Sequence, residues 1–222
     1  MHSFPARTLW VWERPEDLRS VNPRTTAIAI LDATIVVGRS AAVIPRRQPV
    51  IYPVGIKRIA VIRIEAPGPI APGLDNAVAG LILSAAEPGA DALQIDFDAR
   101  ESQHAFYASL LRDLRRRMPV SLPLSITALA SWCSYDNWLS GLPVDEAVPM
   151  FFRMEPDRRY APQDRPQFRI REPLCMGSIG ISTREPHPFS LAGKRVYIFP
   201  DRGWHDDLPL IPSIDPAQRV QQ

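Results

Sequence analysis

Asp91-Ala-Leu-Gln-Ile-Asp-Phe-Asp98 is the stretch of this sequence that decides the fold, and Ala99-Arg100-Glu101-Ser102 follows it directly. Alternate side chains of a β-strand share a face, so Gln94, Asp96 and Asp98 lie on one face and the apolar residues between them on the other. Burying two carboxylates is costly unless they are paired, hydrogen-bonded or hydrated. A strand of this kind that runs directly into a helix is typical of one βα unit of a barrel, with its acids at the mouth.

Strand-like patterns recur along the whole chain. The predicted strands are Thr8–Glu13, Thr26–Val36, Ile59–Glu65, Ala92–Asp98, Leu124–Ser131, Ala147–Met154, Ser178–Thr183 and Arg195–Pro200, and the predicted helices are Leu74–Ala86, Ser102–Arg117 and Tyr135–Leu142. Alternation of strand and helix in the middle of the chain favours parallel pairing. We therefore predict an α/β fold, a small and partly degenerate (β/α)₈ TIM-type barrel that forms a single domain over residues 1–222. The alternative is a mixed α/β sheet with solvated strand ends.

The predicted strands also share an arrangement of faces. In the second strand Ile28 and Ile30 oppose the alanines at positions 27 and 29, and in the fifth strand Ser125 and Thr127 oppose two apolar residues. Each apolar face suits packing against outer helices, and each small or polar face suits the interior of a barrel.

Composition excludes several classes of function. The net charge of +2 predicts no affinity for nucleic acid. No segment is long and apolar enough to span a membrane, and no signal peptide is visible. The protein is therefore expected in the cytoplasm by default, or exported if an upstream leader is missing. The oligomeric state stays open.

Cysteine and histidine positions predict neither a disulfide nor a metal site. Cys133 and Cys175 are too few for a disulfide scaffold, and in the predicted layout they lie near opposite ends of the barrel, which argues against a bond between them. The four histidines lack metal-ligand spacing, so no metal or other cofactor is predicted. Trp204-His-Asp-Asp207 is interpreted as an exposed polar turn, with a cation site as the less favoured alternative.

Acids and aromatic residues gather at the carboxyl ends of the predicted strands, where barrels carry their catalytic residues. The candidate catalytic residues are Asp98, Asp96, Glu65 and Glu185, and the candidate substrate-binding residues are Glu13, Trp12, Trp132, Arg153 and Trp204. Carboxylates together with tryptophans are typical of sugar chemistry. One acid protonates the glycosidic oxygen, another group stabilises positive charge at the anomeric carbon, and aromatic rings pack on sugar faces.

Asp98 is the predicted general acid because it lies at the tip of its strand. Asp96, one step deeper, would raise the proton affinity of Asp98 by like-charge repulsion. Alternatively, Arg63 or Arg153 pairs with Asp96 and holds it ionised. A further alternative is an interior Arg–Asp–Glu network that only fills the barrel.

The stretch from Asp91 to Asp98 resembles the fourth-strand signature of family-18 glycoside hydrolases, Asp-Gly-x-Asp-x-Asp-x-Glu. Asp98 stands where that family has its catalytic glutamate, and Gln94 replaces the middle aspartate. Val148-Pro-Met-Phe-Phe-Arg-Met154 resembles the family's Met-x-Tyr-Asp strand, with Phe152 and Arg153 in place of Tyr and Asp. The resemblance implies a barrel that acts on carbohydrate, but the pair that supports a substrate acetamido group is missing.

A second resemblance covers nearly the whole chain. The sequence is similar to an uncharacterised bacterial family, domain of unknown function 3142, over Trp10–Leu18, Leu93–Asp98, Ser125–Cys133, Val144–Met150, Gly177–Pro186 and Val196–Phe199. That family implies no established activity.

The function predicted from the sequence is a glycoside-hydrolase-like barrel that binds a carbohydrate and, if catalysis is retained, hydrolyses it with strand-end carboxylates. One alternative is a non-catalytic carbohydrate-binding or scaffolding barrel, a pseudoenzyme. Another is an enzyme of a different class, such as a lyase or an esterase.

Overall fold

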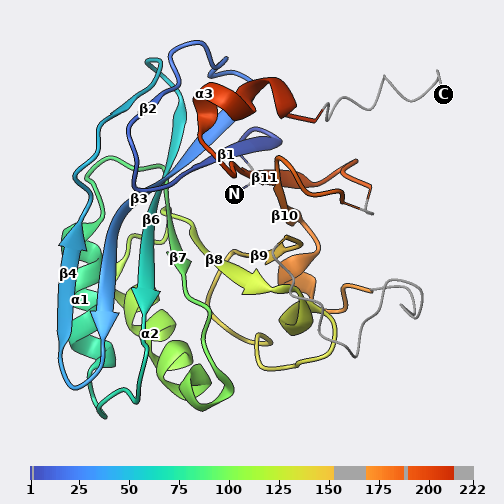
Figure 1. Ribbon diagram of the computed structural model, residues 1–222. Helices are drawn as coiled ribbons and strands as arrows, with labels where there is room; N and C mark the ends of the chain where they lie inside the picture. Colours follow the sequence, from blue (N-terminus) through green and yellow to red (C-terminus); the bar gives the residue numbers. More distant parts are fainter. Residues whose placement is uncertain (2, 153–168, 188–189, 213–222) are drawn as a thin grey trace.

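The computed structural model describes residues 1, 3–152, 169–187 and 190–212, and within them eight parallel strands close into a barrel (Figure 1). The barrel strands are β1 (Arg7–Val11), β3 (Thr26–Val37), β6 (Lys57–Glu65), β7 (Ala92–Asp96), β8 (Leu124–Leu129), β9 (Glu146–Met150), β10 (Ser178–Ser182) and β11 (Arg195–Phe199). Their order around the ring is β1, β11, β10, β9, β8, β7, β6 and β3, and the pairing of β3 with β1 closes it. The prediction of an α/β barrel is confirmed, and each predicted strand is present with its ends within a few residues of those expected, except that the last two residues of the strand predicted at Ala147–Met154 lie outside the described residues.

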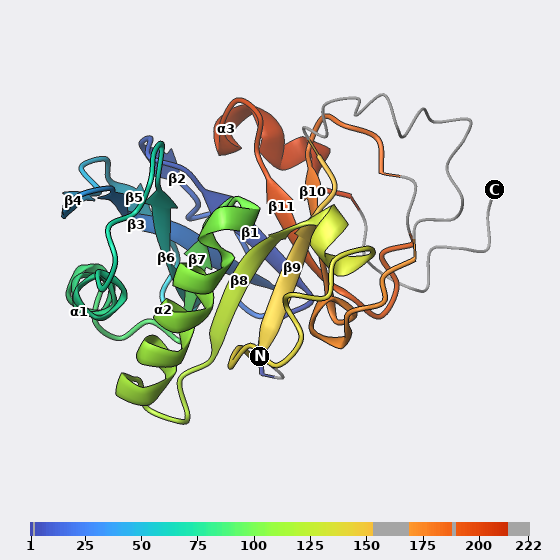
Figure 2. The ribbon, with the colours of Figure 1, turned by 90° about the horizontal axis from the view of Figure 1, so that it is seen from below.

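Helices cover only part of this barrel. α1 (Asp75–Ala85) joins β6 to β7, α2 (His104–Arg117) joins β7 to β8, and Figure 2 shows both on one side of the strand ring. The other described elements are β2 (Glu16–Asp17), β4 (Ala41–Pro45), β5 (Val50–Ile51), α3 (Trp204–Asp207) and the 3-10 turns η1 (Glu101–Gln103), η2 (Ala130–Cys133), η4 (Pro173–Cys175) and η5 (Leu208–Leu210). None of the described helices is long and apolar enough to cross a bilayer.

Side-chain alternation explains how the strands use their two faces. The outward faces of β6, β7 and β8 form one buried cluster with α1 and α2, which includes Ile62, Ile95 and Ile126. The inward face of β3 carries Ala27 and Ala29, and these small side chains leave room inside the barrel for large rings. The rings are Trp10, Tyr197 and Phe199. The predicted faces of these strands are therefore confirmed.

The opposite outer wall is covered by short segments instead of long helices in the described part of the chain. Trp204 of α3 is fully buried there, in a cluster with Ile28 and Ile30 on the outward face of β3. Its indole Nε1 donates a hydrogen bond to the Trp10 carbonyl oxygen at 2.8 Å, and its backbone N–H donates to Glu16 Oε2 at 3.0 Å. These contacts anchor α3 against the barrel.

The predicted helix Tyr135–Leu142 is wrong, because this segment consists of turns. β8 ends at Leu129, and the backbone N–H of Tyr135 donates to the carbonyl oxygen of Ser131 at 2.9 Å as the chain turns back. Gly141 has a φ of 77°, in the left-handed region that a right-handed helix excludes. Leu139 and Leu142 are buried in this segment, and the residues between them are exposed.

Cys133 and Cys175 form a disulfide with a Cα–Cα distance of 5.9 Å, so the prediction that they lie too far apart is wrong. The predicted strand ran on to Ser131, which placed Cys133 beyond the mouth. In the structure η2 folds back onto the outer wall, and both cysteines are buried in the cluster that contains α2. The backbone N–H groups of residues 171 and 172 donate to the Cys133 carbonyl oxygen, so the segment that leads into β10 passes beside η2 and brings Cys175 next to Cys133.

Candidate functional site

One side of the barrel mouth is built by polar side chains from β6, β7 and β8. Asp96, the last residue of β7, is 4% exposed. It accepts hydrogen bonds from Thr127 Oγ1 at 2.8 Å and from Arg63 Nη1 at 3.2 Å. Arg63 Nε also donates to Glu65 Oε1 at 3.3 Å. These contacts join Arg63, Asp96 and Glu65 in one network, and Arg63 is one of the two arginines that were candidate partners of Asp96.

Burial raises the pKa of Asp96, because a charged carboxylate loses its hydration inside the barrel. The charge of Arg63 and the hydrogen bond from Thr127 act in the opposite direction, and the nearby charge of Asp98 raises the pKa of Asp96 further. The sequence placed the effect of like-charge repulsion on Asp98. At Asp96, burial is the largest cause of the raised pKa, and like-charge repulsion from Asp98 contributes less.

Asp98 and Glu65 are the accessible carboxyl groups on this side of the mouth. Glu65 is the last residue of β6, and Asp98 lies two residues beyond the end of β7; both are exposed. An approaching ligand can contact these two groups directly. Asp96 lies behind the partly exposed Arg63 side chain.

Aromatic rings lie where β1, β9 and β11 end. Trp12 follows β1 and is half-buried, with its ring centroid 5.3 Å from that of Trp10 and 6.1 Å from that of Phe199. Phe152 follows β9, and its ring centroid lies 4.5 Å from that of Phe199. All the barrel strands are parallel, so these rings lie at the same end of the barrel as Asp96 and Glu65. The mouth thus combines a carboxylate side with an aromatic side.

Two of the tryptophans predicted to bind substrate are buried. Trp132 is 3% exposed and packs outside the barrel wall, with its ring centroid 5.8 Å from that of His104 and 4.8 Å from that of Trp138. Trp204 lies on the opposite outer wall and anchors α3. Both rings pack in the outer walls of the barrel, and of the predicted tryptophans only Trp12 lies at the mouth.

The other predicted residues are scattered. Glu13 is exposed beyond β1, and its Oε1 accepts hydrogen bonds from the backbone N–H groups of residues 47 and 48 at 2.9 and 3.1 Å. Glu185 is exposed in the loop that follows β10. Arg153 lies outside the described residues. The proposed roles of Glu185 and Arg153 stay predictions.

Asp207 is a buried carboxylate that the sequence did not indicate, and it joins the segments that follow β10 and β11. Asp207 is 0% exposed, so the predicted exposed turn is wrong at this residue. Its Oδ2 accepts from Thr183 Oγ1 at 2.7 Å and from the backbone N–H of Asp201 at 2.8 Å, and its Oδ1 pairs with Arg184 at 2.8 Å. Burial acts to raise the pKa of Asp207, but these hydrogen bonds outweigh it and the pKa lies below its usual value. With only four residues, α3 shows no periodicity from which burial can be predicted.

A second polar network fills the interior near the opposite end of the barrel. Glu146, the first residue of β9, accepts hydrogen bonds from Tyr197 Oη at 2.7 Å and Ser125 Oγ at 3.3 Å, and it pairs with Arg195. Burial, together with Glu146, raises the pKa of Tyr197 well above its usual value. The carboxylate is satisfied from within the protein, which favours a structural role for this end.

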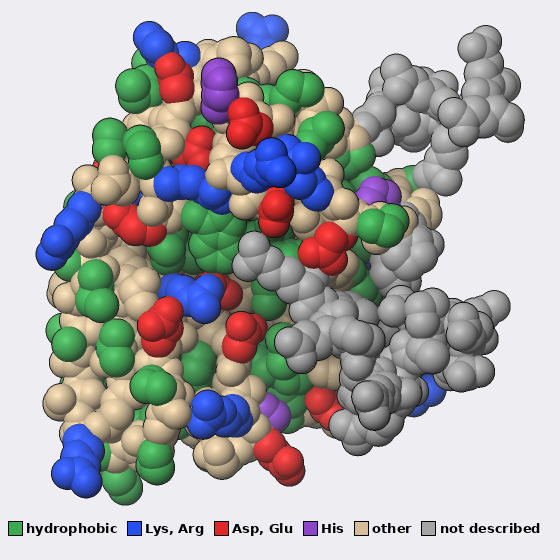
Figure 3. All heavy atoms as spheres, in the orientation of Figure 1, with side chains coloured by type: hydrophobic (Ala, Val, Ile, Leu, Met, Phe, Trp, Pro, Cys, Tyr) green, Lys and Arg blue, Asp and Glu red, His purple; other side chains and the backbone are tan. Residues whose placement is uncertain are grey.

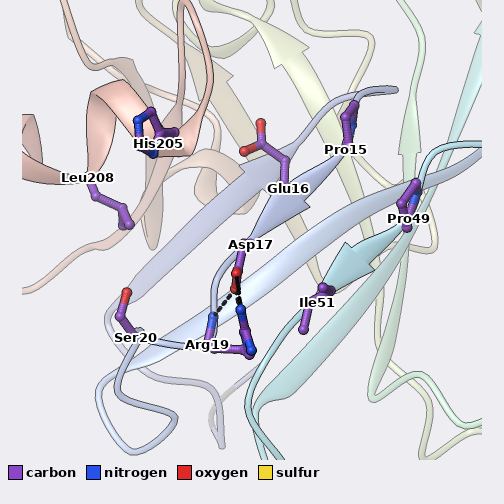
Figure 4. Close-up of a pocket in the computed structure, with 9 residues that line it drawn as sticks. All are labelled: Pro15, Glu16, Asp17, Arg19, Ser20, Pro49, Ile51, His205 and Leu208. Atoms are coloured by element: carbon purple, nitrogen blue, oxygen red, sulfur yellow. Dashed lines mark hydrogen bonds and ion pairs between the residues drawn. The ribbon is translucent and has the colours of Figure 1, made fainter.

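A groove outside the mouth lies between β2, β5 and α3 (Figure 4). Figure 4 shows His205 of α3 and Leu208 of η5 on one side and Ile51 of β5 on the other, with the paired Asp17 and Arg19 between them. Hydrogen bonds from Arg19 lower the pKa of Asp17 to about 2. Each of the two carboxylates of the groove is thus paired with an arginine of the same chain, Asp17 with Arg19 and Glu16 with Arg14. On the face seen in Figure 3, acidic and basic side chains are likewise interspersed around an apolar hollow.

Among the described residues, no group of three or more His, Cys, Asp or Glu side chains is arranged to hold a metal ion. The carboxyl groups at the mouth can accept hydrogen bonds and exchange a proton, and Trp12 adds a partly exposed aromatic ring at the same end of the barrel.

The comparisons with known proteins agree with one resemblance seen in the sequence. Neither the curated proteins nor the solved structures contain a match to this chain. Residues 58–151 match the model of a family described as Domain of unknown function (DUF3142). This stretch runs from β6 through β9 and holds Arg63, Glu65, Asp96 and Asp98. The resemblance to family-18 glycoside hydrolases stays a prediction. The similarity to this family therefore covers the strands that carry the carboxylate side of the mouth.

Proposed function

We propose that this protein is a partly degenerate TIM-type barrel that binds a carbohydrate at its mouth and hydrolyses a glycosidic bond there. The observation that carries the proposal is the pairing of two exposed carboxyl groups, Asp98 and Glu65, with the buried Asp96 at the ends of adjacent strands. Trp12 at the same end offers an aromatic surface to a sugar face. A closed parallel barrel fits either an enzyme or a binding scaffold, so the chemistry at the mouth has to distinguish them.

In the proposed reaction Asp98 donates a proton to the glycosidic oxygen as the bond from that oxygen to the anomeric carbon breaks. Water adds to the anomeric carbon and gives up a proton to a carboxylate, for which Glu65 and Glu185 are the candidates. The carboxylate of Asp96 stabilises the positive charge that develops on the sugar ring, and Arg63 and Thr127 favour its ionised form. The products are two sugars with free hydroxyl groups, and no cofactor takes part.

A non-catalytic carbohydrate-binding barrel is the second candidate. It is favoured by the two contacts of Arg63, which pairs with both Asp96 and Glu65 and so neutralises part of the charge that catalysis needs. Asp98 is also one methylene shorter than the glutamate found at this position in the glycoside hydrolases that the sequence resembles.

Substitution of Asp98 by Asn is expected to lower turnover by at least ~100-fold, the usual scale for lost acid catalysis, while binding survives. The amide keeps the size of the side chain but cannot donate a proton in this way. A glycan array and a thermal-shift screen identify the ligand, and hydrolysis of each hit is then measured for the wild type and the variant.

The matched control is Asp17→Asn, which removes an exposed carboxylate in the groove outside the mouth and should leave turnover unchanged. Normal turnover by Asp98→Asn would remove Asp98 from the mechanism. Binding of a glycan without hydrolysis by the wild type would favour the non-catalytic candidate, and a lack of any glycan binding would contradict both.

Trp12→Ala is expected to weaken glycan binding by about tenfold, because a stacked aromatic contact contributes roughly 0.5–1.5 kcal/mol beyond its buried area. Isothermal titration with a glycan from the screen measures the change. Trp138→Phe, in the cluster outside the wall, should leave the affinity unaltered. Equal affinities of the wild type and Trp12→Ala would place the sugar elsewhere.

A further inference from the structure

Gln103 joins the two loops that carry the exposed carboxyl groups of the mouth. The residue is 6% exposed. Its side-chain Oε1 accepts a hydrogen bond from the backbone N–H of Arg100 at 2.9 Å, and its Nε2 donates to the carbonyl oxygen of Ala66 at 3.2 Å. One amide group thus bridges the loop after β6 and the loop after β7.

Only one of these two bonds belongs to ordinary helix capping. The bond from the Arg100 N–H is the reciprocal contact of a capping box at the start of η1, which satisfies a backbone donor that the helical turn leaves free. The bond to Ala66 has no part in starting a helix. It connects segments that are 37 residues apart in the sequence.

The two residues that Gln103 bridges lie next to the exposed carboxyl residues of the mouth. Ala66 directly follows Glu65, and Arg100 comes two residues after Asp98. Arg100 Nη1 adds an exposed contact between the same loops by donating to the Pro67 carbonyl oxygen at 3.3 Å. The amide of Gln103 is therefore the buried link between the backbone beside Glu65 and the backbone beside Asp98.

We infer that Gln103 is a positioning residue that sets the separation of Glu65 and Asp98 at the mouth. The inference rests on the proposed function only in that it treats these carboxyl groups as the reacting pair. The position requires a donor and an acceptor on one planar group. Glutamine supplies both, an ionised glutamate supplies only the acceptor, and methionine fills the space with neither.

The test compares Gln103→Met and Gln103→Glu with the wild type by NMR, using the backbone amides of residues 65–67 and 98–100 and the carboxyl carbons of Glu65 and Asp98. No substrate is required. Gln103→Met should shift both sets of resonances. Gln103→Glu should shift them at pH 7, where its carboxylate cannot donate to Ala66. The difference from the wild type at the same pH should disappear as the pH falls and the new carboxyl group becomes protonated, because the neutral acid restores both bonds.

Ser125→Ala is the control, since it removes a buried hydrogen-bonding side chain from the network near the other end of the barrel. It should leave the Glu65 and Asp98 resonances unchanged. If Gln103→Met does not fold, Gln103→Glu alone decides the matter through its pH dependence. Unshifted resonances in the folded variants, or shifts in only one of the two loops, would overturn the inference.

With a hydrolysed glycan in hand, Gln103→Met should lower kcat by about 10- to 100-fold and change KM much less, the scale expected when reacting groups are misplaced. Failure to find a substrate contradicts the proposed function but leaves the NMR result intact. Shifted resonances combined with an unchanged kcat would show that the separation does not matter for catalysis, and would overturn the positioning role.

Discussion

Replacing Cys133 and Cys175 together by alanine will lower the free energy of unfolding by about 4 kcal/mol. The disulfide links residues separated by 42 positions, and a cross-link of this span removes conformational entropy from the unfolded chain. It also holds η2 against η4 behind β9, where the backbone N–H groups of residues 171 and 172 donate to the Cys133 carbonyl oxygen at 2.8 and 3.2 Å. Urea unfolding followed by tryptophan fluorescence measures the loss.

The wild type unfolded with and without a reducing agent provides the control for the double variant. Reduction should destabilise the wild type by a similar amount and leave the alanine variant unaffected. Identical unfolding curves for the wild type under both conditions would show that the bond contributes nothing.

Asp207→Ala is expected to lower the free energy of unfolding by about 3 kcal/mol, the lower end of the range for breaking a buried ion pair. Asp207 is fully buried, but its partner Arg184 is partly exposed, which reduces the effect. The substitution also leaves the Thr183 hydroxyl and the backbone N–H of Asp201 without their acceptor. Urea unfolding at pH 7 measures the loss, and Asp206→Ala on the exposed side of the same helix is the control, with little expected change.

The contribution of Asp207 should also depend on pH. Its pKa in the folded protein lies below the usual value of 3.8, so at acid pH the unfolded chain takes up the proton first. The stabilisation is therefore complete above 3.8 and is lost as the pH falls through the lower folded-state pKa. The difference in stability between the wild type and Asp207→Asn should narrow as the pH falls below 3.8 in a series of urea titrations. A difference that stays constant from pH 7 to pH 3 would contradict the assigned network.

The strands and their faces could be predicted from the sequence because alternation is a local property. Ile95 and Ile126 each lie between two polar residues of their strand, and Ile62 lies beside Arg63, so alternation places all three isoleucines on the outward face. The stretch from Asp91 to Asp98 likewise indicated that Asp96 lies inside the barrel mouth, where the structure places it at 4% exposure. The helix from His104 to Arg117 was visible from its apolar spacing and from the proline that follows it.

The contacts of the site depend on residues far apart in the chain. Arg63 was one of two candidate partners for Asp96, and the register between β6 and β7 selects it by placing the two residues side by side. The contact of Gln103 with Ala66 could not be predicted from a local pattern, because Ala66 lies in another loop. Trp132 and Trp204 looked like ligand contacts in the sequence, but the chain leaves its strands by turning outward and buries both rings in the outer walls.

The sequence by itself determined the strands of this barrel, the inward and outward faces of the strands, and the concentration of acids at the strand ends. These follow from side-chain periodicity, which acts over a few residues. Only the tertiary structure decided that Cys133 meets Cys175, that Asp207 is buried, and which carboxyl groups stay open to solvent at the mouth. Those outcomes depend on strand register, on the residue at which the chain leaves each strand, and on hydrogen bonds between distant loops, and none of these is encoded in a local pattern.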